Sequence, residues 1–437
     1  MVVMGGIIGS GIFINPYIVA RMVHTPGLIL GAWVAGGVLA MIGAFVYAEL
    51  ADRLPAVGGQ YAYIRQAYHP AAGFLFGWAS IFVMGAGGSA AVAVTFAKYF
   101  RELTHIGVPE NLLAVAALVF LVLINCFGVR AGSGVQSLFM VLRILAVALV
   151  VFSGAWFLTH RMNFTAPTWH LLLDRPISFN LLTALGATMV PVLFAYGGWQ
   201  TANFIASEIR DPRRNLPRAL LLGVLSVVLL YVSVNFIYVE ILAPSGLAAN
   251  TTPASEVMRR SLGDAGAALI ACAIAISTLG FLSQSMLTYP RVCFAMAADG
   301  VFPQRFARLA SRTRAPVWAI ILQGSIISAV VLLGTFEQIL NYTVVMDWLF
   351  FGLTASCLFV FRARDGRASA QGAAPAKVGY RVPGHPWTTG LFTGAAWLIV
   401  LNTIYQFPRD SMVAFCILFA GLPVYFLMRR RQARPAG

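Results

Sequence analysis

Two glycine clusters within long apolar stretches are the residues of this chain best suited to bind a ligand through the backbone. The first cluster reads Gly5-Gly6-Ile7-Ile8-Gly9-Ser10-Gly11-Ile12-Phe13, and the second reads Phe194-Ala195-Tyr196-Gly197-Gly198-Trp199. Glycine weakens a helix by about 1 kcal/mol per residue relative to alanine, and the neighbouring Pro16 and Pro191 add further disruption. Each cluster therefore predicts a broken helix. A half-helix that restarts there offers unpaired N–H groups and the positive end of its dipole, which suit a carboxylate.

Close packing of membrane helices is the other use of such glycine clusters, and a single cluster would favour that interpretation. Here the two clusters lie five predicted spans apart, and each has a proline beside it. Broken helices at corresponding positions of two halves are typical of transporter binding sites. The pair of clusters therefore favours a binding site.

Two ionisable side chains, Arg143 and Asp347, lie deep inside other apolar stretches. Charged residues within membrane spans are rare, are paired or solvated, and often mark functional sites. Arg143 is either a fixed internal cation that replaces a coupling ion or a structural partner of first-helix carbonyls, and the two roles overlap. Asp347 could bind a proton, contact a cationic substrate or pair with a basic residue.

Patterns for catalysis and metal binding are missing from the sequence. It contains neither His-Glu-x-x-His nor Gly-x-Ser-x-Gly, and its 6 histidines lie near predicted loops and helix ends. The 5 cysteines fall in apolar stretches, where they are typical of small core residues and not of disulfides or metal sites. They are Cys126, Cys272, Cys293, Cys357 and Cys416. We expect no enzyme activity, no metal and no cofactor.

Composition places these residues in a membrane. The chain is 59% hydrophobic and 10% charged, and a soluble domain of 437 residues could not bury that much apolar surface. A spanning helix needs roughly 20 apolar residues, and runs of that length recur throughout. We predict twelve helices, over residues 1–22, 27–52, 70–98, 111–128, 134–158, 179–206, 217–242, 263–297, 316–334, 336–361, 388–407 and 411–428.

The placement of basic residues predicts the orientation of these helices. With the N-terminus inside, most of the 30 Lys and Arg residues fall in cytoplasmic segments, as the positive-inside rule requires. We therefore expect a multi-pass protein of the cytoplasmic (inner) membrane with both termini cytoplasmic. The longest polar insertion, about 362–386, is rich in Ala, Gly, Arg and Pro and is expected to be a solvated connector. Glu49 lies at the end of the second predicted helix, beside Asp52 and Arg53. We expect it to form an ion pair or an interfacial gate.

Motifs along the chain resemble those of the amino acid–polyamine–organocation (APC) superfamily, from the first residue to about residue 430. The amino acids of the sixth-helix motif are most similar to those of the L-type amino acid transporter branch. The matching motifs are Gly9–Phe13 with Pro16, Tyr47–Leu50, Pro55–Tyr63, Phe194–Trp199, Glu208, Asp211-Pro212, Asn215–Ala219, Arg291, Ala295–Ala297, Asp299-Gly300, Phe302-Pro303 and Tyr380–Gly384.

The resemblance implies an all-α polytopic membrane protein of about 12 transmembrane helices. Ten helices would form a 5+5 inverted repeat (LeuT-like) with helices 1 and 6 broken, and two would be peripheral. Residues 1–437 would then be a single membrane transport domain, with five-helix repeats at 1–159 and 179–361 and peripheral helices at 388–428. Only eight residues precede Gly9, so the resemblance also implies a first helix that extends upstream of Met1.

The implied function is secondary transport of amino acids across the cytoplasmic membrane by alternating access, as sodium-independent exchange of neutral amino acids. One alternative is a proton-coupled amino acid or polyamine symporter. The other is a membrane receptor or accessory protein that transports nothing. Nucleic acid is not an expected partner, because the charge of +15 is spread over short loops.

The resemblance also implies roles for individual residues. The backbone at Ile7, Ile8, Gly9, Ser10 and Gly11 would hold the substrate carboxylate, and the carbonyls of Phe194, Ala195 and Gly197 would receive the α-ammonium. Phe194 would also be an aromatic gate, and Gln200 would lie near the pocket.

Two features depart from the L-type pattern. The branch usually has a lysine in the middle of the fifth helix, where this chain has Arg143, and a guanidinium does not release its proton as a buried lysine can. Relatives in the branch can also pair with a single-span glycoprotein through a cysteine in an outer loop. None of the five cysteines lies in a predicted outer loop, so we expect no disulfide-linked subunit.

Overall fold

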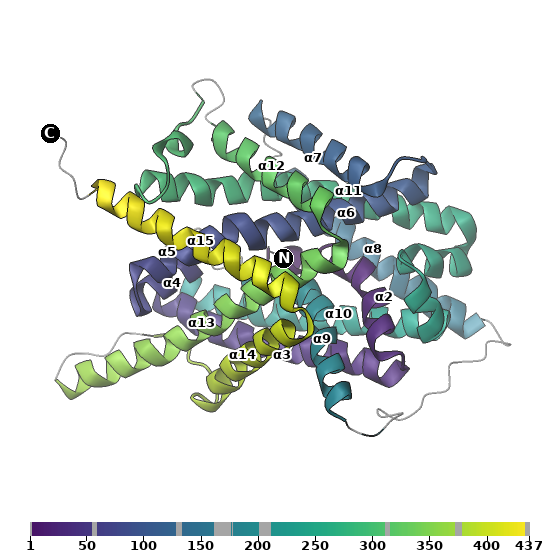
Figure 1. Ribbon diagram of the computed structural model, residues 1–437. Coiled ribbons are helices and arrows are strands. Elements are labelled where there is room, and N and C mark those ends of the chain that lie inside the picture. The colour runs from purple at the N-terminus through teal and green to yellow at the C-terminus, as the bar shows by residue number, and fades with distance from the viewer. Residues whose placement is uncertain are drawn as a thin grey trace.

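The computed structural model describes residues 2–54, 59–127, 133–160, 176, 178–200, 211–310, 315–371 and 378–432. Within these residues every element is helical (Figure 1), which confirms the predicted all-α fold. In chain order the elements are α1 (Val2–Ile7), α2 (Gly11–Val23), α3 (Pro26–Arg53), α4 (Gln60–Ala67), α5 (Pro70–Ala79), η1 (Ser80–Met84), α6 (Gly85–Thr104), α7 (Glu110–Cys126), α8 (Ser133–His160), α9 (Phe179–Tyr196), α10 (Pro212–Ala249), α11 (Pro253–Ala298), η3 (Gln304–Ala307), α12 (Val317–Leu333), α13 (Phe336–Ala370), α14 (Trp387–Gln406) and α15 (Pro408–Gln432).

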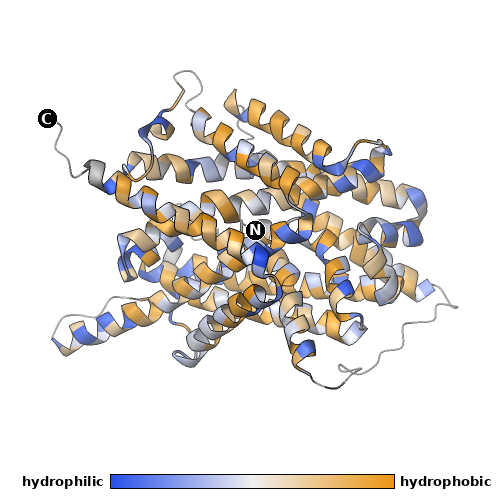
Figure 2. Ribbon diagram, in the orientation of Figure 1, coloured by the Kyte–Doolittle hydropathy of each residue, from blue (hydrophilic) through white to orange (hydrophobic). Residues whose placement is uncertain are grey.

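Nine helices in the described part of the chain are long and apolar enough to cross a membrane. Three shorter apolar helices, Gly11–Val23, Glu110–Cys126 and Val317–Leu333, coincide with the predicted first, fourth and ninth spans. Figure 2 shows apolar residues along the helices and polar residues mostly near helix ends and connections. Large side chains such as Phe120, Leu333 and Phe419 are exposed on the outside, where lipid would cover them. The chain is an integral, multi-pass membrane protein.

Two predicted spans have one boundary at a kink inside a longer helix. The span predicted over 217–242 belongs to α10, which bends at Ala243 (φ 56°, ψ 161°) just before Pro244. The span predicted over 263–297 belongs to α11, which bends at Gly263 with a φ of 74°. Short helical segments therefore precede or follow the membrane-spanning parts.

The predicted solvated connector over 362–386 is helical in its first part, and most of the side chains there are exposed. α13 continues as a helix to Ala370 and projects from the bundle (Figure 1). Basic and acidic side chains in this extension bond to α3 and α4, and those contacts stabilise helical turns that composition alone does not favour.

The broken first helix lies within the bundle. Most residues of α2 are buried, and α2 packs on α9 and α10. Asn15 Nδ2 donates to the Pro191 carbonyl over 2.6 Å, which joins α2 to α9. The Tyr99 hydroxyl donates to the Phe13 carbonyl over 2.8 Å, which joins α2 to α6. These bonds fix α2 against the helices that would surround a ligand.

Candidate functional site

The first helix is interrupted where the first glycine cluster predicts. α1 ends at Ile7 and α2 begins at Gly11. A helix leaves the N–H groups of its first turn without acceptors of its own, so the start of α2 has donors available inside the bundle. The Ser10 hydroxyl is buried, with 3% of the residue exposed, and has no hydrogen-bond partner among the described residues. This end of α2 therefore combines backbone donors with a free hydroxyl.

The second cluster ends a helix as well. α9 stops at Tyr196, and Gly197 leaves the helical conformation with a ψ of 159°. Gly198 has a φ of +105°, which favours glycine. The Gly198 N–H donates to Gln200 Oε1 over 3.0 Å, so the Gln200 side chain bonds to the break itself. Residues 201–206 of the predicted sixth helix lie outside the described residues, and its second half stays a prediction.

The two breaks lie directly against each other. A Cβ added to Gly11 would stand 2.7 Å from the Ala195 Cα atom. A Cβ added to Gly198 would stand 2.1 Å from the Gly6 carbonyl oxygen. Both distances are shorter than real Cβ contacts, so the crossing requires glycine on each side. The structure therefore brings the candidate residues of the two clusters together.

Neighbouring helices supply partners for the carbonyl groups at the end of α1. The Tyr231 hydroxyl of α10 donates to the Ile7 carbonyl over 3.1 Å. Arg143 Nη1 donates to the Gly5 carbonyl over 3.3 Å and to the Ile8 carbonyl over 3.4 Å. The last carbonyls of a helix lack partners of their own and carry the negative end of its dipole, so these donors stabilise the interruption. Sequence reasoning missed Tyr231, since nothing in its own apolar run distinguishes it.

Arg143 also binds α11 and so joins α8, α1 and α11. Its Nε donates to Ser277 Oγ over 3.0 Å, its Nη2 donates to the Ser277 carbonyl over 3.2 Å, and its guanidinium lies 5.3 Å from the Phe281 ring centroid. In the described part of the chain its hydrogen bonds all go to neutral oxygens. This geometry is the one that a structural partner of the first helix requires. It also puts a permanent positive charge beside the break.

Asp347 is not joined to Arg143 by any contact among the described residues. It is half-buried on α13, and Tyr289 of α11 is near enough to interact with its charge. One helical turn before it, Thr343 packs against α6, where a Cβ on Gly87 would lie 2.0 Å from Thr343 Oγ1. Residues four apart share a helix face, so Asp347 lies on the side of α13 that meets the third span.

The third span contains a π-helical turn at the same level. α5 and α6 are joined by η1, over Ser80–Met84, and such turns frequently mark functional sites. η1 packs against both α13 and α11, the helices that carry Asp347 and Tyr289. Sequence reasoning did not predict this turn, because an inserted residue leaves the apolar pattern of a span unchanged.

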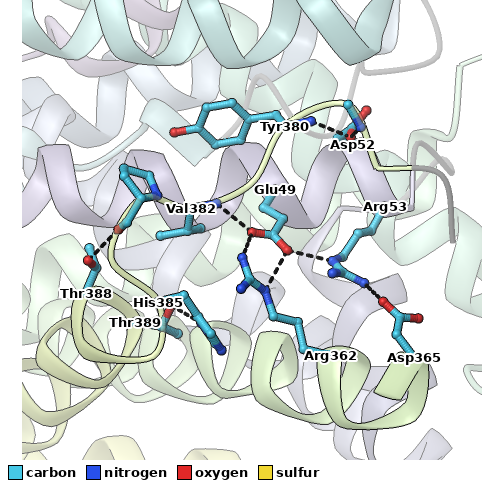
Figure 3. Close-up of polar contacts among 12 residues, drawn as sticks. Glu49, Asp52, Arg53, Arg362, Asp365, Tyr380, Val382, His385, Thr388 and Thr389 are labelled. Carbon is cyan, nitrogen blue, oxygen red and sulfur yellow. Dashed lines mark hydrogen bonds and ion pairs between the residues drawn. The ribbon is translucent and has the colours of Figure 1, made fainter. Parts of the chain in front are cut away.

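A second polar cluster lies at the end of α3, and it confirms the ion pair predicted at Glu49 (Figure 3). Glu49 is 0% exposed. Its Oε1 accepts from Arg53 Nε over 2.8 Å and from Arg362 Nε over 2.9 Å. Its Oε2 accepts from Arg362 Nη2 over 2.5 Å and from the Val382 N–H over 2.6 Å. One carboxylate thus joins α3, α13 and the segment before α14.

Asp52 strengthens the same junction one turn further along α3. Its Oδ2 accepts from the N–H groups of Gly379 and Tyr380 over 2.5 and 3.0 Å, and Arg53 Nη1 pairs with Asp365 Oδ2 over 2.5 Å. Burial, and then the charge of Glu49, raises the pKa of Tyr380 to about 12, so its phenol stays protonated. The Glu49 network is defined here as Glu49, Asp52, Arg53, Arg362, Asp365 and the N–H groups of Gly379, Tyr380 and Val382.

Known proteins are similar to this chain over nearly its whole length. A family model described as amino acid permease matches residues 1–428. The chain is 30% identical to the b(0,+)-type amino acid transporter 1 of Mus musculus, with 98% of this chain and 85% of the relative covered. It is 29% identical to the serine/threonine exchanger SteT of Bacillus subtilis, with 99% and 95% covered. It is also 29% identical to the large neutral amino acids transporter small subunit 2 of Mus musculus, with 99% and 80% covered.

Proposed function

The chain belongs to the amino acid permease family, and from that membership we propose that it carries amino acids across the cytoplasmic membrane by alternating access. We propose sodium-independent exchange of neutral amino acids, because similar proteins include a serine/threonine exchanger and a transporter of large neutral amino acids. The chain would act as one transport domain, with five-helix repeats at 1–159 and 179–361, peripheral helices at 388–428 and both termini cytoplasmic.

The contact between the two helix breaks is the observation that carries this proposal. The substrate carboxylate would bind the backbone of Ile7–Gly11 at the positive end of α2, where the Ser10 hydroxyl lacks a described partner. The α-ammonium would bind the carbonyls of Phe194, Ala195 and Gly197 at the negative end of α9. Opposite helix ends thus meet the two opposite charges that every α-amino acid carries. The half-buried Phe194 would close over the substrate as a gate.

Arg143 supports independence from sodium. Its guanidinium donates to the Gly5 and Ile8 carbonyls, which are neutral oxygens of the kind that bind a metal cation. Because arginine stays protonated at any ordinary pH, this position would hold its positive charge throughout the cycle. Arg143 would therefore act both as a brace for the broken helix and as a fixed replacement for a coupling ion.

A second candidate function is proton-coupled symport, and Asp347 is the observation that favours it. Its carboxylate makes no ion pair or hydrogen bond among the described residues, although it lies within a membrane-spanning helix. Carboxylates within membrane spans often mark proton pathways in transporters. A transport role for Asp347 would thus add a proton to the cycle without changing the amino acid site.

Enzyme activity and a disulfide-linked subunit are not part of the proposed function. The similar proteins named above are transporters and an exchanger, and none is named as an enzyme. All five cysteines are free and lie in helices. We propose that the chain acts without a disulfide-linked partner.

Uptake by purified protein in proteoliposomes tests the proposal. A panel of radiolabelled amino acids is offered at fixed pH without sodium, to vesicles with and without internal amino acids. Uptake only into loaded vesicles would establish exchange. Uptake into empty vesicles that grows with an imposed proton gradient would favour the second candidate, and no uptake under either condition would overturn both.

The gate is tested in the same assay. Phe194→Ala should lower uptake at least tenfold while its amount in the membrane stays close to normal. Phe419→Ala is the matched control, because Phe419 is an exposed phenylalanine on the peripheral helix α15. Equal uptake by the two variants would put the substrate elsewhere.

A further inference from the structure

We propose that the bundle binds an anionic phospholipid where α12 begins, with the lipid phosphate on Arg305 and an acyl chain along the exposed face of α12. The site lies apart from the two helix breaks. The proposal requires only that the chain spans a membrane, and it does not depend on amino acid transport. Three observations support it: the position of Arg305, the arginines that gather at this end of the bundle, and the apolar surface beside them.

The Arg305 guanidinium is held against an aromatic ring, and its N–H groups have no acceptor. Its central carbon lies 3.5 Å from the centroid of the Trp318 ring, and it makes no hydrogen bond or ion pair with any other described residue. Arg364 of α13 differs, because its guanidinium already donates to two carbonyls over 2.8 and 2.9 Å. A guanidinium presents a rigid fork of donors that matches a phosphate. Arg305 therefore has its donors available and its orientation fixed.

Two more exposed arginines lie at the same end of the bundle. A small second core joins the parts of the chain that meet there, and it includes Phe302 before η3, Ala319 in the first turn of α12 and Tyr425 near the end of α15. Arg308 directly follows η3, and Arg429 lies one turn beyond Tyr425. Both are exposed. The three arginines thus surround one corner of the bundle.

The charge at this corner is positive. Within the described part of the chain, no ion pair joins Arg305, Arg308 or Arg429 to an acid. Asp299, in the connection between α11 and η3, lies near Tyr61 of α4. Basic pockets at the ends of membrane helices bind the head groups of anionic lipids. An anionic head group therefore complements the charge of this corner.

An exposed stripe on α12 begins beside Arg305 and follows the helix along its whole length. Its residues are spaced three or four apart, so they share one helix face, and they are Trp318, Ile321, Ser325, Ala329 and Leu332. Tryptophan is enriched at the boundary between head groups and hydrocarbon, which puts Arg305 at the level of the lipid phosphates. A free phosphate would leave the stripe uncovered, whereas a phospholipid would cover it with an acyl chain.

Native mass spectrometry of the purified chain in a neutral detergent measures the binding. Phosphatidylglycerol is the anionic probe, and phosphatidylcholine, which has no net charge, is the matched lipid. A basic residue near an anionic lipid contributes a factor of about five in affinity. The Kd of the tightest-bound phosphatidylglycerol should therefore rise about fivefold in Arg305→Gln, and phosphatidylcholine binding should not change. An equal phosphatidylglycerol affinity in Arg305→Gln and the unaltered chain would overturn the proposal.

Arg409→Gln is the matched control. It removes the same charge from an exposed position in the first turn of α15, at the opposite end of that helix from Arg429. Phosphatidylglycerol affinity should stay unchanged in this variant. Arg305→Lys keeps the charge but loses the fork of donors, and should bind with intermediate affinity. The same loss of affinity in Arg409→Gln as in Arg305→Gln would show a general effect of charge and no site.

The position of the lipid is tested with a phosphatidylglycerol that carries a photoreactive group in its acyl chain. After illumination, peptide mass mapping should find the label on residues 317–333 of the unaltered chain, and much less of it there in Arg305→Gln. Labelling of these residues that does not change in Arg305→Gln would overturn the proposed position, as would labelling confined to other helices.

Other occupants give different results in the same experiments. If glycerol phosphate displaced the lipid as well as phosphatidylglycerol does, the stripe would not belong to the site and the occupant would be a free phosphate. If the unaltered chain were a dimer that dissociated in Arg305→Gln, a second copy would cover the stripe. Either result would overturn the lipid proposal. None of these measurements uses an amino acid, so failure of the uptake assay would leave them interpretable.

Discussion

Gly11 of α2 and Ala195 of α9 lie so close together that a Cβ on Gly11 would stand 2.7 Å from the Ala195 Cα atom. The positive end of one half-helix and the negative end of another are therefore neighbours. Opposite partial charges on adjacent backbone segments match the carboxylate and ammonium of an α-amino acid. Side chains of the substrate would then be selected by other surfaces of the bundle.

Gly11→Ala should disturb this contact even though alanine is the better helix former. The added methyl group overlaps Ala195 and forces the helices apart, and such overpacking costs about 1–3 kcal/mol. We expect a lower Tm and a loss of exchange of at least tenfold. Gly394→Ala is the control, since a Cβ at Gly394 meets nothing within 4 Å. An unchanged Tm for Gly11→Ala would show that the helices separate at no cost.

Tyr231→Phe removes the hydroxyl that donates to the Ile7 carbonyl over 3.1 Å. One hydrogen bond contributes about 0.5–1.5 kcal/mol, so the thermal stability of the purified protein should fall slightly and exchange should slow. Tyr238→Phe is matched to it on the same helix, because the buried Tyr238 hydroxyl has no hydrogen-bond partner among the described residues. That variant should be at least as stable as the unaltered chain. The reverse order of stabilities would contradict the bracing of α1 by Tyr231.

Arg143→Lys should make exchange depend on pH. A single ammonium cannot reach both the first-helix carbonyls and Ser277 as the guanidinium does, and a buried lysine can lose its proton within the accessible pH range. Exchange measured between pH 6 and 9 should fall toward the alkaline end in the variant but not in the unaltered chain. A flat profile in both proteins would count against a role for charge at this position.

Acid should weaken the segment that precedes α14 through His385. Burial, followed by the charge of Arg362, lowers the pKa of His385 from its ordinary value of 6.5, so the folded chain favours the neutral ring. The stability that this residue contributes is present above the ordinary pKa and is lost as pH falls through the lowered one. The drop in Tm between pH 7.5 and 5 should be smaller in His385→Asn than in the unaltered chain.

The control for that measurement is His105→Asn, at an exposed position after α6. Its positive φ of 53° is one that asparagine tolerates. His105→Asn should keep the full acid-dependent drop in Tm. An equal drop in Tm in all three proteins would show that His385 does not cause the loss of stability in acid.

Hydropathy and glycine content were sufficient to predict the helical class, the positions of the spans and the interruption after Ile7. These properties are local, because an apolar run of spanning length or a glycine cluster acts through its own residues. The position of Ser10 at the start of α2 follows from the same cluster. The ion pair at Glu49 was predicted as well, from three charged residues at one helix end.

Contacts between distant segments could not be predicted in this way. Tyr231 contacts α1, and Ser277 contacts Arg143, only after the bundle has formed. The apolar sequence around each of these residues does not indicate those contacts. The helical extension of α13 was missed for the same reason, since Arg362 and Asp365 gain their partners from α3. The repeat boundaries and the residues proposed to touch substrate stay predictions.

The crossing at Gly198 has a consequence for genetic variation in this chain. Every amino acid other than glycine has a Cβ, and here that atom would fall 2.1 Å from a carbonyl oxygen on a backbone with φ of +105°. No missense change at codon 198 is therefore conservative. Even Gly198→Ala, which replaces one hydrogen atom by one methyl group, should be classed as damaging. Natural alleles at this codon should be synonymous ones.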